Sequence, residues 1–121
     1  MHGRFITFRV SLVDAEIHTY ERGHTSVRVE IHARNGKSLE LEFTGLEGLL
    51  DYPGRDISAL VWFATSDFLD AVTQRVFPDG PPEELPYRSY QFLDGDDEVC
   101  LEIIAAHCEE RLDPSDIAVD T

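Results

Sequence analysis

The chain has 121 residues, 42% hydrophobic and 28% charged, which excludes a disordered chain, a coiled coil and a collagen-like repeat. Its length is that of one domain, and no run of about 18 apolar residues could form a transmembrane helix. The net charge of −14 is uneven, because residues 1–60 carry seven basic and nine acidic groups whereas residues 61–121 carry three and 15. The acidic half argues against nucleic acid and membranes as partners and favours a basic protein, although solubility alone would also explain it.

Hydrophobic patterning predicts antiparallel strands in the first half of the chain. Residues 4–13 have the β-branched and aromatic content of a strand, and residues 17–20 either turn or begin a second strand. In residues 27–33 and 39–44 apolar and polar side chains alternate with period two, which is typical of half-buried antiparallel strands.

The turn between these two alternating strands contains Asn35 and Gly36, a common hairpin signal. A two-residue loop would place an acidic residue opposite Ile31 on the inner face. A three-residue loop over residues 35–37 pairs Ile31 with Leu41 instead. We therefore expect the loop of odd length.

One helix is expected in the middle of the chain. Apolar residues over 67–76 follow helical spacing, either Ser66 or Asp67 can cap the first turn, and Pro78 ends the helix. Residues 57–64 fit both a helix and a buried strand, so their structure stays open.

The last third of the chain suggests a loop followed by a second hairpin. Residues 79–86 contain three prolines and are expected to form a loop, and residues 87–93 resemble a strand. An acidic turn at 94–97 precedes residues 98–108, which form either the return strand or a helix; the Asp-Gly turn favours the strand. We expect the acidic tail at 114–121 to fray.

Together these elements predict an α+β fold in one domain over residues 1–121. We expect a mainly antiparallel, curved sheet of about five to seven strands with one helix near 67–76. Cys100 and Cys108 do not form a Cys-x-x-Cys motif, so both are expected to be reduced thiols of a cytoplasmic protein. The first residues lack an apolar signal region, which agrees with that location.

Motifs of catalysis are missing from the sequence. There is no Gly-x-Ser-x-Gly, no glycine-rich phosphate loop and no His-Glu-x-x-His. Asp94, Asp96 and Glu98 superficially resemble a calcium loop, but the glycine and glutamate that such a loop requires are replaced by Val99 and Ala105. We therefore expect no catalysis, no cofactor and no metal.

The five histidines offer the main alternative. They are His2, His18, His24, His32 and His107. A scatter of surface histidines is the favoured interpretation, with His32 opposite Glu40 across the hairpin. In the alternative, a small metal-dependent enzyme would use Glu16, His18 and some of His24, His32 or Asp14, which would have to converge on one cavity.

Three stretches of the chain follow one another in an order found in one protein family. They are Asp14-Ala15-Glu16-Ile17-His18, then residues 27–32 with 41–49, then residues 90–95 leading to 101–103. This order resembles small β-rich immunity proteins of bacterial polymorphic-toxin systems. Val13 stands where that family has a histidine, and residues 57–77 with the proline-rich loop resemble insertions.

The resemblance implies a cytoplasmic protein without catalysis that binds and neutralises one cognate toxin. Carboxylates would pair with the lysines and arginines of a basic toxin domain, and tyrosines would anchor it, with at least one of the two tyrosines expected in the core instead. The candidate partner-binding residues are Asp94, Asp96, Asp97, Glu98, Glu109, Glu110, Tyr87 and Tyr90. A structural module that self-associates through a strand edge, for example as a homodimer, is a further alternative.

Overall fold

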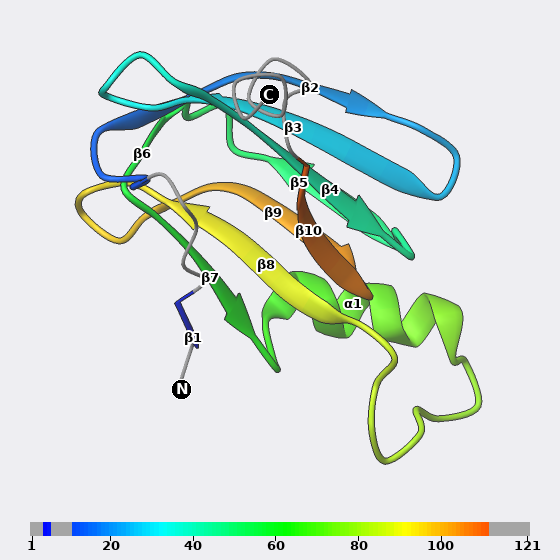
Figure 1. Ribbon diagram of the computed structural model, residues 1–121. Coiled ribbons are helices and arrows are strands. Elements are labelled where there is room, and N and C mark those ends of the chain that lie inside the picture. Colours follow the sequence, from blue (N-terminus) through cyan, green and yellow to red (C-terminus); the bar gives the residue numbers. More distant parts are fainter. Residues whose placement is uncertain (1–3, 6–10, 112–121) are drawn as a thin grey trace.

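The computed structural model describes residues 4–5 and 11–111 and confirms an α+β fold of mostly antiparallel strands with one helix (Figure 1). Within these residues ten strands form two five-stranded sheets, sheet A in the order β1-β7-β8-β9-β5 and sheet B in the order β10-β4-β3-β2-β6. The strands are β1 Arg4–Phe5, β2 Ala15–Arg22, β3 Ser26–His32, β4 Ser38–Thr44, β5 Gly48–Asp51, β6 Asp56–Ile57, β7 Ala59–Phe63, β8 Arg88–Leu93, β9 Val99–Ala105 and β10 His107–Arg111.

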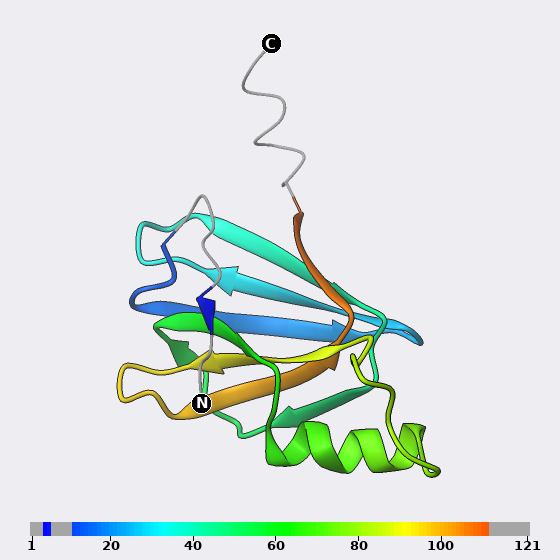
Figure 2. The ribbon, with the colours of Figure 1, turned by 90° about the horizontal axis from the view of Figure 1, so that it is seen from below.

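The structure has three layers, with sheet A in the middle. Sheet B packs on one face of sheet A, and α1, Asp67–Val76, lies on the other face (Figures 1 and 2). The main core between the sheets includes Phe43, Phe92, Leu101 and Ile103, all fully buried. A smaller cluster beneath α1 includes Leu69, Val72, Tyr87 and Ile104. No element within the described residues covers the outer face of sheet B. The strand residues on that face, such as Arg28 and Glu42, are polar and can therefore face solvent.

The β3–β4 hairpin has a loop of odd length, as expected, but its register differs by two residues from the prediction. Ile31 pairs with Leu39 rather than Leu41, and the loop is 34–36 because Ala33 N donates to Lys37 O at 2.8 Å. The last residue of such a three-residue loop takes the left-handed conformation. Gly36, with φ of 85°, fits that position only when the loop ends at residue 36.

The predicted strand over residues 4–13 is wrong at its C-terminal end. Residues 11–13 are not a strand, because Ala15 N donates to Leu12 O at 3.0 Å and closes a turn. Asp14 has φ of 58° in this turn, and β2 begins directly after it. Residues 17–20 therefore belong to a second strand, while residues 6–10 lie outside the described residues.

The structure confirms the predicted helix and second hairpin and decides the segment that the sequence left open. The helix spans the predicted residues 67–76, and the ambiguous residues 57–64 contain the whole of β7 rather than a helix. Residues 94–98 turn the chain into β9, which confirms the hairpin interpretation. The expected single sheet is divided in two, because the chain bends at Ala106 and enters sheet B as β10. The tail at 114–121 lies outside the described residues.

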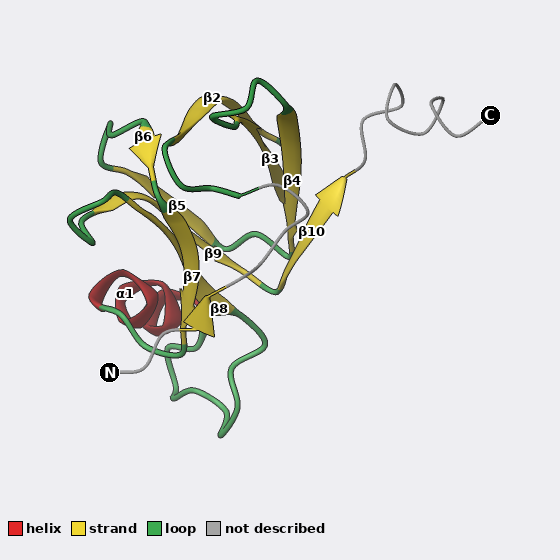
Figure 3. Ribbon diagram, turned by 60° about the vertical axis from the view of Figure 1, so that its left-hand side comes forward, coloured by secondary structure: helices red, strands yellow, loops and turns green. Residues whose placement is uncertain are grey.

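The crossing at Ala106 depends on a glycine in the neighbouring segment. Figure 3 shows β9 leading into β10. Ala106 N donates to Thr44 O at 2.9 Å and to Gly45 O at 3.3 Å, so the bend between these strands is held by backbone hydrogen bonds. A Cβ at Gly45 would lie 2.7 Å from the Ala106 Cβ, and Gly45 has φ of 65°. Both the close approach and the backbone conformation require glycine here.

A buried carboxylate anchors the start of α1. Glu102, only 3% exposed, points from β9 toward the helix, and its Oε2 accepts hydrogen bonds of 2.6 Å from Ser66 and from Ser89. Ser66 also caps the helix, because its Oγ accepts a hydrogen bond of 3.0 Å from Leu69 N. The cap and the buried acid therefore share one hydroxyl.

We expect Ser66→Ala to lower the free energy of unfolding by about 1–2 kcal/mol, because it removes a cap and one donor of the buried carboxylate. Thr65→Ala at the exposed neighbouring position is the matched control and should change the stability by less than about 0.5 kcal/mol. Urea unfolding followed by circular dichroism measures both. Equal effects of the two substitutions would contradict this account.

A second polar network joins the two sheets at their edges. Tyr20 of β2 donates to Asp51 Oδ2 at 2.8 Å, and Arg55 donates to both oxygens of Asp51 at 3.0 Å. The hydrogen bonds from Arg55 hold the pKa of Asp51 below its ordinary value of 3.8, and the Tyr20 bond adds to this against the opposing effect of burial. The ionised carboxylate is therefore the form that stabilises the contact.

Asp51→Asn should lower the free energy of unfolding by about 1 kcal/mol at pH 7, the size expected for a partly exposed ion pair with hydrogen bonds. Because the pKa of Asp51 is lower in the folded state than in the unfolded chain, its stabilisation is present above the unfolded pKa and is lost as the pH falls through the folded pKa. Urea titrations should show a difference between variant and wild type at pH 7 that shrinks as the pH is lowered to 3, below the ordinary pKa of 3.8.

The control for this experiment is Asp14→Asn, which breaks the exposed ion pair of Asp14 with Arg34 at 3.2 Å. Exposed pairs contribute little, so this variant should stay close to wild type. If Asp51→Asn gave the same loss at both pH values, the ionised form of Asp51 would not be the stabilising one.

Candidate functional site

The acidic turn between β8 and β9 is held by its own first residue. Asp94 Oδ1 accepts hydrogen bonds from Asp96 N at 2.8 Å and from Glu98 N at 3.0 Å. Asp97 has φ of 61°, a conformation that aspartate tolerates. Asp94 is therefore a structural residue of the turn, while Asp96, Asp97 and Glu98 expose their carboxylates to solvent.

Two aspartates from other segments extend this turn into a larger acidic surface. Asp14, Asp56, Asp94 and Asp96 line a shallow cleft of about 370 Å³, hereafter the aspartate cleft. The short strand β6 brings them together, because it pairs with β2 and the next residue, Ser58, donates to Leu93 O at 2.7 Å. Sequence reasoning missed Asp56 and considered Asp14 only as a metal ligand, since a two-residue strand has no recognisable pattern.

The other predicted acidic residues lie on a different side of the molecule. Glu109 and Glu110 belong to β10, at the edge of sheet B opposite to β6 (Figures 1 and 2). Glu109 is exposed, while Glu110 is half-buried and lies opposite Leu41. The predicted carboxylates therefore do not form one surface.

Tyr87 and Tyr90 are both buried, which confirms the expectation that at least one packs in the core and corrects their predicted role as exposed anchors. They are 6% and 4% exposed. Tyr87 donates to Thr73 Oγ1 at 3.1 Å beneath α1, and Tyr90 packs edge-to-face on Phe43 with ring centroids 5.2 Å apart. Their large apolar rings contribute more by filling the core than they could at a solvated rim.

Like charges face each other directly across several strand pairs of sheet B. Asp56 lies opposite Glu16, Glu30 opposite Glu40, and Glu109 opposite Glu42. Arginines offset part of this repulsion, since Arg28 and Arg111 contact Glu42 at 3.6 and 3.5 Å. Directly opposed carboxylates destabilise a sheet, so a bound cation or cationic partner would relieve a cost already present in the fold.

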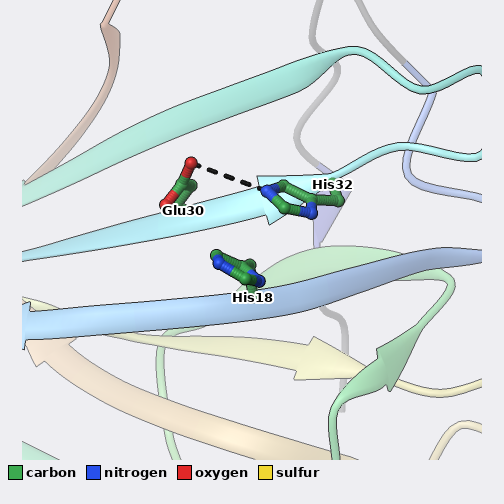
Figure 4. A group of neighbouring side chains, drawn as sticks. All are labelled: His18, Glu30 and His32. Carbon is green, nitrogen blue, oxygen red and sulfur yellow. Dashed lines mark ion pairs between the residues drawn. The ribbon is translucent and has the colours of Figure 1, made fainter.

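Two of the five histidines meet on the outer face of sheet B. A bulge in the β2–β3 pairing between Ile17 and Thr19 leaves His18 beside His32, with the rings stacked at a centroid distance of 4.1 Å (Figure 4). Glu30 lies next to them, with Oε1 3.5 Å from His32 Nε2. The predicted cross-strand pairing of His32 with Glu40 is not formed, because His32 lies opposite Ser38. The carboxylate in contact with His32 is that of Glu30 in the same strand.

The ligand set of the sequence-based enzyme alternative does not converge. Within the described residues, the three donors that gather closely are His18, Glu30 and His32. Asp14 lines the aspartate cleft, and His24 lies exposed in the turn between β2 and β3. Glu30 was missed, although its two-residue spacing from His32 in an alternating strand places both side chains on one face.

Both cysteines are free thiols. Burial, and then the neighbouring Glu109 carboxylate, raise the pKa of Cys108 to about 12. Burial also raises the pKa of Cys100, whose Sγ lies 3.5 Å from Asp56 O. Since the thiolate is the nucleophile, neither position is poised for nucleophilic or redox chemistry.

The cysteines should therefore resist alkylation in the folded protein. A pKa of about 12 against the ordinary 9.0 lowers the thiolate fraction of Cys108 at pH 8 by about a thousandfold. Iodoacetamide with peptide mass spectrometry should show slow labelling of both cysteines in buffer and rapid labelling in urea. Rapid labelling of folded Cys108 at pH 8 would contradict the raised pKa.

No family model, curated protein or solved structure matches the chain. Among the described residues no helix is long and apolar enough to cross a membrane.

Proposed function

We propose that the protein is a non-catalytic acidic binding protein, an immunity protein that neutralises a cognate basic bacterial toxin in the cytoplasm by covering its active surface. The aspartate cleft is the observation that carries this proposal. Its four aspartates come from three separate segments and gather at one end of the molecule. One of them, Asp14, is ion-paired with Arg34.

The arrangement of the acidic groups supports binding over solubility as their role. Solubility requires net charge but not carboxylates placed directly opposite each other, which costs stability. Lysines and arginines of a partner, such as those a nuclease toxin uses to hold phosphate, would find complementary charge at the cleft. Complementary fields speed encounter, and ion pairs that become desolvated slow dissociation.

The role of the cleft in binding can be tested by reversing its charge. Asp56→Lys with Asp96→Lys changes two exposed cleft residues and leaves Asp94, which holds the turn, in place. Asp79→Lys with Glu83→Lys is the matched control, because it changes the net charge equally at exposed loop positions after α1. Each variant serves as bait in a lysate of the source cells.

A captured basic protein is then tested for toxicity when expressed alone and together with each variant. We expect wild type and control to protect the cells, and the cleft variant to protect poorly and to associate at least about tenfold more slowly at low salt. Equal protection by both variants would exclude the cleft as the binding surface. A captured partner that is harmless when expressed alone would overturn the immunity function itself.

A further inference from the structure

We propose that His18, Glu30 and His32 form a binding site for a divalent transition metal ion, with Zn²⁺ as its representative. One donor atom from each residue lies within 4.8 Å of the other two. His and carboxylate side chains are the donors that Zn²⁺ takes in open sites, where three protein ligands leave a fourth position to water. This inference does not depend on the proposed toxin partner.

The spacing of the donors already approaches that of a metal complex. Zn–N and Zn–O bonds of about 2.0–2.2 Å place tetrahedral ligands about 3.4 Å apart. His32 Nε2 and Glu30 Oε1 are 3.5 Å apart, so this pair needs almost no movement. Rotation of the exposed His18 side chain about its own bonds would bring its nitrogen to the same distance.

The strands hold the three side chains on one face. Glu30 and His32 are two residues apart in β3, so both point outward from sheet B. His18 follows the buried Ile17 in β2 and therefore also points outward, beside them, as Figure 4 shows. Bulges commonly re-aim a side chain next to a functional site, and regular strands position ligands more firmly than loops do.

The electrostatic surroundings also favour a cation at this position. Glu40, which Arg111 contacts at 3.8 Å, lies directly opposite Glu30 in the β3–β4 pair, and Glu16 lies opposite His32 in the β2–β3 pair. The described structure gives Glu30 no arginine or lysine ion pair. A bound Zn²⁺ would offset the repulsion between these carboxylates and replace the bare stacking of the two imidazole rings.

The test is calorimetric titration of the full chain, free of any affinity tag, with zinc chloride. We expect one Zn²⁺ per chain for wild type, and binding weakened at least about tenfold in His18→Asn, His32→Asn and Glu30→Gln. His24→Asn and His107→Asn remove other exposed histidines and serve as matched controls that should bind as wild type. All five changes are at exposed or half-exposed positions, and circular dichroism checks their folding.

Spectroscopy gives an independent readout of the ligands. Cobalt(II) in place of zinc should give a visible absorption band in wild type and in both control variants, and this band should be lost in His18→Asn and His32→Asn. The proposal is overturned if wild type shows no saturable zinc binding. It is also overturned if the control variants weaken binding equally, or if Asp56→Asn with Asp96→Asn abolishes it, which would place the ion in the aspartate cleft.

Discussion

The passage of the chain from β9 of sheet A to β10 of sheet B through the bend at Ala106 is the constraint on which the rest of the structure depends. It joins the two sheets covalently at one edge, so that their apolar faces close over a common core. The bend is possible because Gly45 leaves room for Ala106 and takes a backbone conformation that other residues avoid. Across the molecule, Tyr20 and Asp51 tie sheet B to β5 by a hydrogen bond.

This arrangement gives the two sheets different chemical roles. Sheet A is covered on both faces, and six of the seven residues of β9 are buried, which is why Glu102 requires two hydroxyl donors. In the part of the chain that the structure describes, sheet B is covered on one face only, and its strands alternate and present charged side chains outward. The groups available for binding therefore collect on the outer face of sheet B and at the ends of the strands.

The sequence was sufficient to predict the inner and outer faces of the hairpin and the limits of the helix, because both depend on local periodicity and capping. The register of the hairpin could not be predicted in this way, because it depends on the left-handed position that Gly36 fills. The aspartate cleft could not be predicted either, because it depends on the two-residue strand β6. The sequence favoured core packing for at least one of Tyr87 and Tyr90 but did not show that both are buried, since β8, which follows Tyr87 and contains Tyr90, is covered on both faces and has no alternation to read.

The histidine pair shows why a site on a sheet is harder to predict than one on a helix. Spacing of three or four residues brings helical ligands together within one segment, but here His18 meets His32 only through the pairing of two strands. A regular register would alternate faces along β2, and the bulge breaks that alternation so that His18 and Thr19 are both exposed. A bulge costs ladder hydrogen bonds, and Glu30 opposite Glu40 adds repulsion at the same place, which Arg111 at 3.8 Å from Glu40 offsets in part. Two unfavourable features at one position of an otherwise regular sheet are better explained by a bound cation than by the requirements of folding.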